Sequence, residues 1–211
     1  MMTETALVAE FLQHPIIAEI MARLSAELPA DLYYHSPHHT LHVLTVALRF
    51  AEYDGLKHRE LELLAIAAAY HDAGYIQTRV DNEPIGAAMA ADAMKAADVY
   101  TKADIDTVQN MILSTACLRD GNGLSRVPCN HLSRYLLDAD LSLFGHEDYF
   151  TIAEQLRREM GMDRKSFLNQ SLHMITGHDW FTITAFEICE KQKLININRL
   201  KDAIAKSDLS V

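Results

Sequence analysis

The segment that decides the fold runs from Leu61 to Asp72 and reads LELLAIAAAYHD. As far as Ala69 it is apolar on nearly every side, which is typical of a helix buried in the middle of a domain. His71 and Asp72 follow directly. A charged carboxylate at the end of a buried helix is costly unless it is paired or bound to a cation. The segment therefore predicts a helical core with a polar site at one end of its central helix.

Helical spacing of apolar residues continues on both sides of this segment. Pro15 divides the pattern over residues 3–28 into two helices, and Pro37 suits the first turn of a helix that ends near Tyr53. Further helices are predicted over residues 57–70, 84–97, 104–117, 130–144, 146–160, 163–176, 179–190 and 196–206. No segment alternates convincingly over strand length, and residues 120–123 (Asp-Gly-Asn-Gly) form the clearest loop. The pattern predicts an all-α fold of about ten helices.

The composition is that of a globular chain. It has 211 residues, of which 49% are hydrophobic and 23% charged. These fractions exclude collagen-like and disordered classes, and no apolar stretch approaches the roughly 20 residues that a membrane span requires. We expect a single domain over residues 1–211, with its core at about 33–200 and the helices of 3–28 packed on it.

The charge balance, 19 basic against 29 acidic residues, gives a net charge of −10. Such a surface repels a phosphate backbone, so nucleic acid is not an expected partner, and neither is a membrane. Cys117, Cys129 and Cys189 have no motif spacing, and the first residues lack a basic and then apolar leader. These features predict reduced thiols in the cytoplasm.

Three groups of histidines and carboxylates stand out against the apolar background. One lies at the start of the helix that Pro37 opens, one follows the buried helix, and one places two acids in an apolar run. Their members are His35, His38, His39, His42, His71, Asp72, Asp138 and Asp140. A single buried histidine is more often a core residue than a ligand, but three such groups in a small helical chain indicate a site. Imidazole nitrogen with carboxylate oxygen suits Zn, Fe, Ni, Mn or Co.

In their order these residues resemble the H…HD…D pattern of the HD superfamily of metal-dependent phosphohydrolases. Residues 34–43 (YHSPHHTLHV) are similar to the family pattern Y-H-N-x-x-H-x-x-x-V, with Ser36 where Asn is usual. Residues 69–75 (AYHDAGY) look like the HD signature, and residues 138–145 (DADLSLFG) resemble the D-A-D-L-S-I-L-G stretch of a bacterial subgroup of predicted HD hydrolases. Asn82-Glu83 and residues 157–159 also resemble that subgroup. The likeness covers roughly residues 33–200.

The resemblance implies an HD-type helical bundle with one divalent metal ion, whether Mn, Fe, Ni, Co, Zn or Mg. Carried over by position, the ligands are His39, His71, Asp72 and Asp140. Asp140 fits the family's last ligand better than Asp138, which is assigned to orienting a ligand from behind. Members with two metals insert two further histidines between the HD motif and the last aspartate, where this chain has only His131. We therefore expect a mononuclear site.

The chemistry implied is hydrolysis by a metal-activated water, because a divalent ion polarises a phosphoryl oxygen and can lower the pKa of bound water to about 7. Asp72 then counts as catalytic as well as ligating. Glu83 is the candidate base or water-positioning residue, with an exposed acid in a first helical turn as its alternative. Arg79 is the candidate phosphate clamp in catalysis and substrate binding, with a solvated loop arginine as its alternative. His35 and His38 are candidates for substrate contact, and a surface position is preferred for His42.

Two later features receive structural interpretations. His178-Asp179 is a second HD dipeptide, and Asp179 there is expected to be a helix N-cap. Arg157 and Arg158, followed by Glu159, are expected to form a structural ion pair, with a substrate role as the alternative if that helix lines the cleft.

The expected function is hydrolysis of a phosphate ester of a nucleotide or another small molecule, with phosphomonoesterase and phosphodiesterase not distinguished. The alternative is a non-catalytic regulatory module that keeps the HD pocket for a nucleotide, although the complete ligand set favours an enzyme. An HD-type iron oxygenase is a weaker alternative, because it needs two irons and the extra ligands. The substrate, the metal and the oligomeric state stay open, with a homodimer among the expectations.

Overall fold

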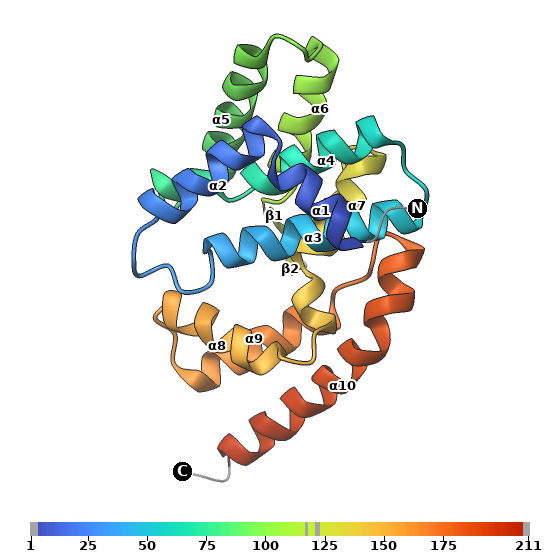
Figure 1. The fold of residues 1–211 in the computed structure, drawn as a ribbon. Helices are drawn as coiled ribbons and strands as arrows, with labels where there is room; N and C mark the ends of the chain where they lie inside the picture. Colours follow the sequence, from blue (N-terminus) through green and yellow to red (C-terminus); the bar gives the residue numbers. More distant parts are fainter. Residues whose placement is uncertain (1–3, 117, 121–122, 209–211) are drawn as a thin grey trace.

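The computed structural model describes residues 4–116, 118–120 and 123–208, and helices dominate these residues (Figure 1). The all-α prediction is confirmed. The α-helices in chain order are α1 (Glu4–Leu12), α2 (Pro15–Glu27), α3 (Pro37–Tyr53), α4 (His58–Tyr70), α5 (Asn82–Ala97), α6 (Lys102–Leu113), α7 (His131–Asp140), α8 (Tyr149–Glu159), α9 (Arg164–Thr176) and α10 (Ile183–Asp208). Two short 3-10 helices, η1 (Ala73–Ile76) and η2 (Ser142–Gly145), follow α4 and α7.

Helix α4 is the centre of the main hydrophobic core, as the segment from Leu61 predicts. Its residues from Leu64 to Ala69 are fully buried. Helices α2, α3, α5, α6 and α7 all pack against it. The run of alanines permits this crowding because small side chains let neighbouring backbones approach closely. The end of α4 is therefore held firmly on all sides.

A second, smaller hydrophobic cluster is formed by η2 and helices α8, α9 and α10. Its fully or nearly fully buried members include Tyr149, Ile175 and Leu200. In Figure 1, α8 and α9 lie below α3, on the side opposite to α5 and α6. Trp180 packs against both clusters. The segment that follows α3, α4 and α7 in the sequence thus covers the side of the core on which His39 and Asp140 lie.

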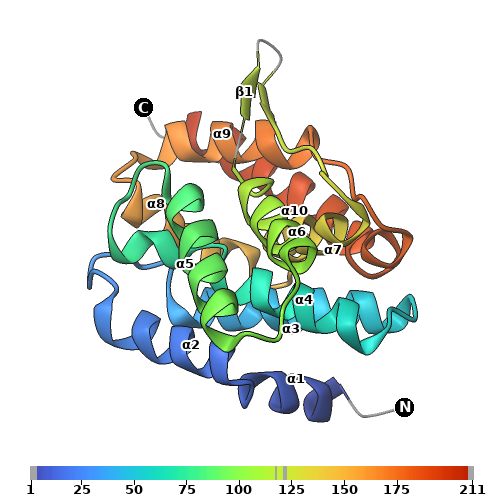
Figure 2. The ribbon, with the colours of Figure 1, turned by 90° about the horizontal axis from the view of Figure 1, so that it is seen from above.

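The expectation that no strand occurs is wrong in one place. Strands β1 (Leu118–Asp120) and β2 (Gly123–Ser125) form an antiparallel hairpin between α6 and α7, with Leu118 opposite Ser125. Figure 2 shows this hairpin extending away from the helices. Strands of three residues are too short for an alternating pattern to reveal. Cys117 and the centre of the predicted loop, residues 121–122, lie outside the described residues.

The C-terminal region also differs from its prediction. The sequence predicts two helices, over 179–190 and 196–206, whereas α10 is continuous from Ile183 to Asp208. Asp179 is not its N-cap, because the hydroxyl of Thr182 accepts the hydrogen bond from the Ala185 amide at 3.2 Å. Among the described helices, none combines the length and apolar character that a bilayer crossing requires.

Candidate metal centre

The first turn of α3 positions His39. Ser36 is the N-cap of α3, and its side chain accepts a hydrogen bond from the His39 amide at 3.4 Å. Pro37 occupies the first helical position, where its fixed φ is compatible with a helix. The imidazole of His39 consequently points inward from a rigid helix start, and the side chain is only 7% exposed.

The end of α4 positions the next two residues. His71 is 1% exposed, and its Nδ1 donates a hydrogen bond to the Ala68 carbonyl at 2.8 Å. This bond fixes the ring and leaves the Nε2 lone pair of the neutral imidazole free to face the site. Asp72 follows at the turn into η1. The side-chain amide nitrogen of Asn82 lies 3.5 Å from Asp72 Oδ1.

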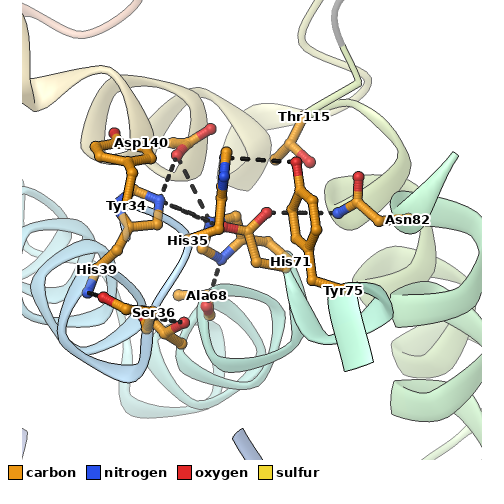
Figure 3. A network of polar contacts seen from close by, with 12 residues as sticks. Tyr34, His35, Ser36, His39, Ala68, His71, Tyr75, Asn82, Thr115 and Asp140 are labelled. Carbon is orange, nitrogen blue, oxygen red and sulfur yellow. Dashed lines mark hydrogen bonds and ion pairs between the residues drawn. The ribbon is translucent and has the colours of Figure 1, made fainter. Parts of the chain in front are cut away.

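Helix α7 completes the cluster, because Asp140 lies at its last residue. His39 Nε2 lies 3.4 Å from His71 Nε2, 3.4 Å from Asp72 Oδ2 and 3.2 Å from Asp140 Oδ1 (Figure 3). His71 Nε2 lies 3.1 Å from Asp72 Oδ2 and 3.6 Å from Asp140 Oδ1. Two donors that bind one ion at about 2.0–2.2 Å lie at most about 4.4 Å apart. All five separations satisfy this limit.

The chemistry of the cluster also fits a cation. Asp72 Oδ2 is buried and accepts no hydrogen bond of acceptable geometry from the described residues. A buried carboxylate oxygen without a partner is costly, and a bound ion removes that cost. The donor atoms of His39, His71 and Asp140 all lie within 4.8 Å of one another, so these three buried side chains could hold a divalent metal. Asp72 is not part of this group of three, although its Oδ2 lies 3.1 Å from His71 Nε2 and 3.4 Å from His39 Nε2.

The charges in the cluster stabilise one another. Burial disfavours the imidazolium forms, but Asp72 and Asp140 outweigh burial and raise the pKa of both His39 and His71. Burial likewise opposes ionisation of Asp140, yet the charge of Arg126 and the nearby imidazoles hold its pKa well below the usual range. The pKa of Asp72 is lowered too, mainly by the charge of His71 against the effect of burial. Both carboxylates are therefore ionised at neutral pH.

Arg126 is a site residue that the sequence analysis missed. It lies after β2, and its Nη1 donates to Asp140 Oδ2, while Asp140 Oδ1 faces the two imidazoles. The arginine thus occupies one carboxylate oxygen and directs the other toward the cluster. No motif or periodicity marks this residue, because it lies in an irregular segment.

Asp138 does not orient a ligand of the cluster, which corrects the role expected for it. Its carboxylate accepts hydrogen bonds from the Phe181 amide at 2.9 Å, the Thr182 amide at 2.9 Å and the Thr182 hydroxyl at 2.7 Å. The residue is fully buried. It ties α7 to the start of α10, on another face of α7 from Asp140.

His35 belongs to a second polar group beside the cluster. Its Nδ1 donates to Glu159 Oε1, and Glu159 Oε2 accepts from the amides of Tyr34 at 2.8 Å and His35 at 3.1 Å. The Tyr75 hydroxyl lies 3.5 Å from His35 Nε2, and the Tyr75 ring stacks on the imidazole of His35 (Figure 3). The expected ion pair within residues 157–159 is therefore wrong. Glu159 binds His35, whereas Arg157 pairs with Glu154 and Arg158 lies over the Tyr33 ring.

The other predicted residues surround the cluster at greater distance. Arg79 pairs with Asp31 at 2.5 Å and lines a cavity together with His35 and Asp140. His38 lines a smaller cavity of about 250 Å³ with His39, His42 and Asp140. Glu83 is half-buried in the first turn of α5, where it is Asn82 that contacts Asp72.

Three further histidines are accounted for. His42 is half-buried rather than exposed and hydrogen-bonds with the Ser142 hydroxyl at 3.0 Å. His131 is 65% exposed and donates to Glu60 at 2.9 Å, so it contributes nothing to the cluster. His178 lies edge-on between the rings of Phe144 and Trp180.

Comparison with known protein families gives one match. The family model described as the HD domain matches residues 38–144, just over half of the chain. The matched stretch includes His39, His71, Asp72 and Asp140, and it ends before α8 begins. No curated protein matches the chain.

Proposed function

The chain belongs to the HD domain family, and from that premise we propose that it is a metal-dependent phosphohydrolase acting on a phosphate ester of a small molecule. The observation that carries the proposal is the buried cluster at the end of α4, in which Asp72 Oδ2 accepts no hydrogen bond from the described residues and faces two imidazole nitrogens. A cation bound between these groups would satisfy that oxygen. The family, whose members are mostly metal-dependent hydrolases, accounts for it directly.

In this proposal His39, His71, Asp72 and Asp140 hold the ion. When bound, a divalent cation polarises a phosphoryl oxygen and lowers the pKa of a coordinated water. His71 and Asp140 are held for this task by groups behind them, the Ala68 carbonyl and Arg126. Such supporting contacts fix the orientation and basicity of ligands.

The remaining polar residues are proposed to act on the substrate. His35 is held by Glu159 and presents its Nε2 toward Tyr75, at the edge of the cluster. We assign His35 and His38 to contact with the phosphate ester. Arg79 is assigned to attracting the negatively charged ester to the site. Glu83 stays the candidate base, although it is the neighbouring Asn82 whose side chain contacts Asp72.

The test combines metal analysis with a screen for turnover. Wild-type protein, Asp72→Ala and His71→Ala are purified, their metal content is measured by mass spectrometry, and phosphate or monoester release is assayed on a panel of phosphoesters with added Mn²⁺, Ni²⁺ or Zn²⁺. His131→Ala is the matched control, because it removes an exposed histidine whose only described contact is Glu60. We expect loss of turnover and of stoichiometric metal in the first two variants, and wild-type values in the control.

Two results would contradict the proposal. If wild-type protein binds metal and nucleotides but releases no product from any ester, the chain is a binding module. If an oxidised product forms with two irons bound per chain, it is an oxygenase.

A further inference from the structure

A cavity of about 470 Å³ opens beside the cluster and is larger than the histidine-lined cavity on the other side of Tyr34. Asp140, His35 and Tyr75 form its end nearest the cluster. Its volume lies in the range of cavities that hold small organic ligands. An ester group bound at the cluster would therefore have this space directly in front of it.

The far walls of the cavity are apolar and aromatic. They are contributed by η2, α8 and α9, and their largest side chains are Leu143, Phe144, Tyr149, Phe167 and Met174. The polar groups on this side are few, namely the Tyr149 hydroxyl near Ser171 and the side chain of Gln170. The wall therefore offers mainly hydrophobic contact.

The charged groups that line the cavity are already paired. Glu159 binds His35, Asp140 binds Arg126, and Arg79 binds Asp31. Among the described residues that line it, Arg79 is the single lysine or arginine. A second phosphate would consequently find no additional cation along this wall, which disfavours nucleoside polyphosphates as occupants.

Most of this wall lies outside the stretch that the HD family model matches. That match covers residues 38–144, whereas α8 and α9 supply the part of the cavity from Tyr149 to Met174. The cluster thus lies within the stretch that the family model matches, whereas α8 and α9, which lie outside it, build most of the cavity wall. Residues that distinguish substrates are expected in such a place.

We propose that this cavity binds the organic group of the substrate, and that the group is apolar, either an aryl or a branched alkyl group. The inference rests on the proposed phosphohydrolase function and extends it to a substrate class. Burial of a larger apolar group against this wall should then increase kcat/KM, because the binding energy of that group also stabilises the transition state of the ester bound at the cluster.

The test varies the organic group and the wall independently. Hydrolysis is compared for ethyl phosphate, phenyl phosphate, naphthyl phosphate and ribose 5-phosphate. Binding of methylphosphonate and phenylphosphonate, which are not hydrolysed, is measured by calorimetry with Mn²⁺ present. Met174→Trp fills the cavity, Met174→Leu is the conservative control, and Met160→Trp at the 48% exposed rim is a second filling variant in case the first folds poorly.

We expect naphthyl phosphate to exceed ethyl phosphate and ribose 5-phosphate in kcat/KM by tenfold or more, and phenylphosphonate to bind at least tenfold more tightly than methylphosphonate. The tryptophan variants should abolish both preferences by lowering kcat/KM for naphthyl phosphate and the affinity for phenylphosphonate. Hydrolysis of all esters at similar rates, with no effect of the filling variants, overturns the inference and leaves the phosphohydrolase function intact. If no ester is hydrolysed, the proposed function fails, and the phosphonate series still decides whether the cavity prefers apolar groups.

Discussion

Asp138 and Asp140 are two residues apart on α7, and what each carboxylate contacts determines its task. Asp140 receives a guanidinium on one oxygen and faces two imidazoles with the other. Asp138 accepts three hydrogen bonds from Phe181 and Thr182, which engage both of its oxygens away from the cluster. Side chains two apart on a helix point in very different directions, so the two acids serve different neighbours.

Substitution of each acid separates the two tasks. Asp140→Asn should weaken Mn²⁺ binding by more than the roughly 10- to 100-fold that loss of a supporting contact costs. Asp138→Asn should keep metal affinity and lower the free energy of unfolding by about 1–3 kcal/mol, because an amide nitrogen cannot accept a backbone hydrogen bond. Calorimetric titration with Mn²⁺ and urea unfolding of both variants provide the measurement. If Asp138→Asn lost Mn²⁺ binding and Asp140→Asn kept it, Asp138 would be the metal ligand instead.

Arg126 supports Asp140 through charge as well as orientation. Its removal in Arg126→Met should raise the pKa of Asp140, so that protons compete with the metal at higher pH. We expect metal affinity to fall about tenfold at pH 7, with a larger loss at pH 5.5. Arg134→Met, at an exposed arginine of α7, the helix that carries Asp140, is the control. A loss that does not depend on pH would mean that Arg126 acts through orientation alone.

His178 should influence stability in acid. Burial between Phe144 and Trp180 lowers its pKa to about 3, with the charges of Lys193 and Arg126 adding to the effect. Because the unfolded chain takes up this proton near pH 6.5, the folded state loses stability as pH falls from about 6.5 toward 3. His178→Phe removes this cost. The variant should therefore gain roughly 1–2 kcal/mol relative to wild type between pH 6.5 and pH 5, measured by urea unfolding at both pH values. An equal difference at both values would contradict this.

The sequence pattern predicts the residues of the cluster more successfully than it predicts the side chains that hydrogen-bond to them. His39, His71 and Asp140 lie at motif positions on α3, α4 and α7, and their donor atoms are close together. Arg126 could not be found in this way, because it lies in an irregular segment after β2. Glu159, at the end of α8, stands out in the sequence only with the two arginines before it, and its contact with His35 could not be predicted. Glu159 lies 124 residues from His35 in the sequence. Local spacing carries no information about such a contact.

At the scale of elements, helix α10 shows why a predicted break can be absent. The predicted interruption covers residues 191–195 and ends at Asn196, the first residue of the second predicted helix and one with poor helix propensity. Its side chain is fully buried, and the amide nitrogen donates to the carbonyls of Phe144 at 3.0 Å and His146 at 2.8 Å. These two bonds tie α10 to the end of η2. Tertiary contact therefore overrides the local preference, whereas α4 follows its pattern because burial and propensity agree.

This anchoring can be tested on a single helix. Asn196→Ala leaves the buried Phe144 carbonyl without its described donor, whereas the His146 carbonyl keeps the Tyr149 amide at 3.2 Å, and the free energy of unfolding should fall by about 1–3 kcal/mol. Asn198→Ala, an exposed asparagine two residues further along α10, should change it by less than about 0.5 kcal/mol. Urea unfolding of both variants makes the comparison. Equal small effects would mean that water replaces the donor in the variant.

At the scale of the whole molecule, the cluster links the elements that enclose the core, because α3, α4 and α7 each contribute to it. Their ends meet at a point where two carboxylates and two imidazoles are withdrawn from water. In the absence of an ion, protons on the imidazoles balance the carboxylates. A divalent cation would take over this role and join the three helices at one point. Metal binding should consequently be visible as global stability.

The stabilisation by a bound ion should depend on pH. Burial opposes protonation of His39 and His71, but Asp72 and Asp140 raise their pKa, so in metal-free protein the stability from these pairs is present below about pH 6.5 and is lost as pH rises through the raised values. Metal requires the deprotonated rings, so its apparent affinity increases over the same range. At 100 times its dissociation constant a ligand contributes about 2.7 kcal/mol, which for a chain of this size corresponds to a rise in Tm of about 5–11 °C. We expect Mn²⁺ to raise Tm by this amount at pH 8 and by much less at pH 6, EDTA to reverse it, and His71→Ala to show no response. A shift that persists in His71→Ala would place the bound ion elsewhere on this acidic chain.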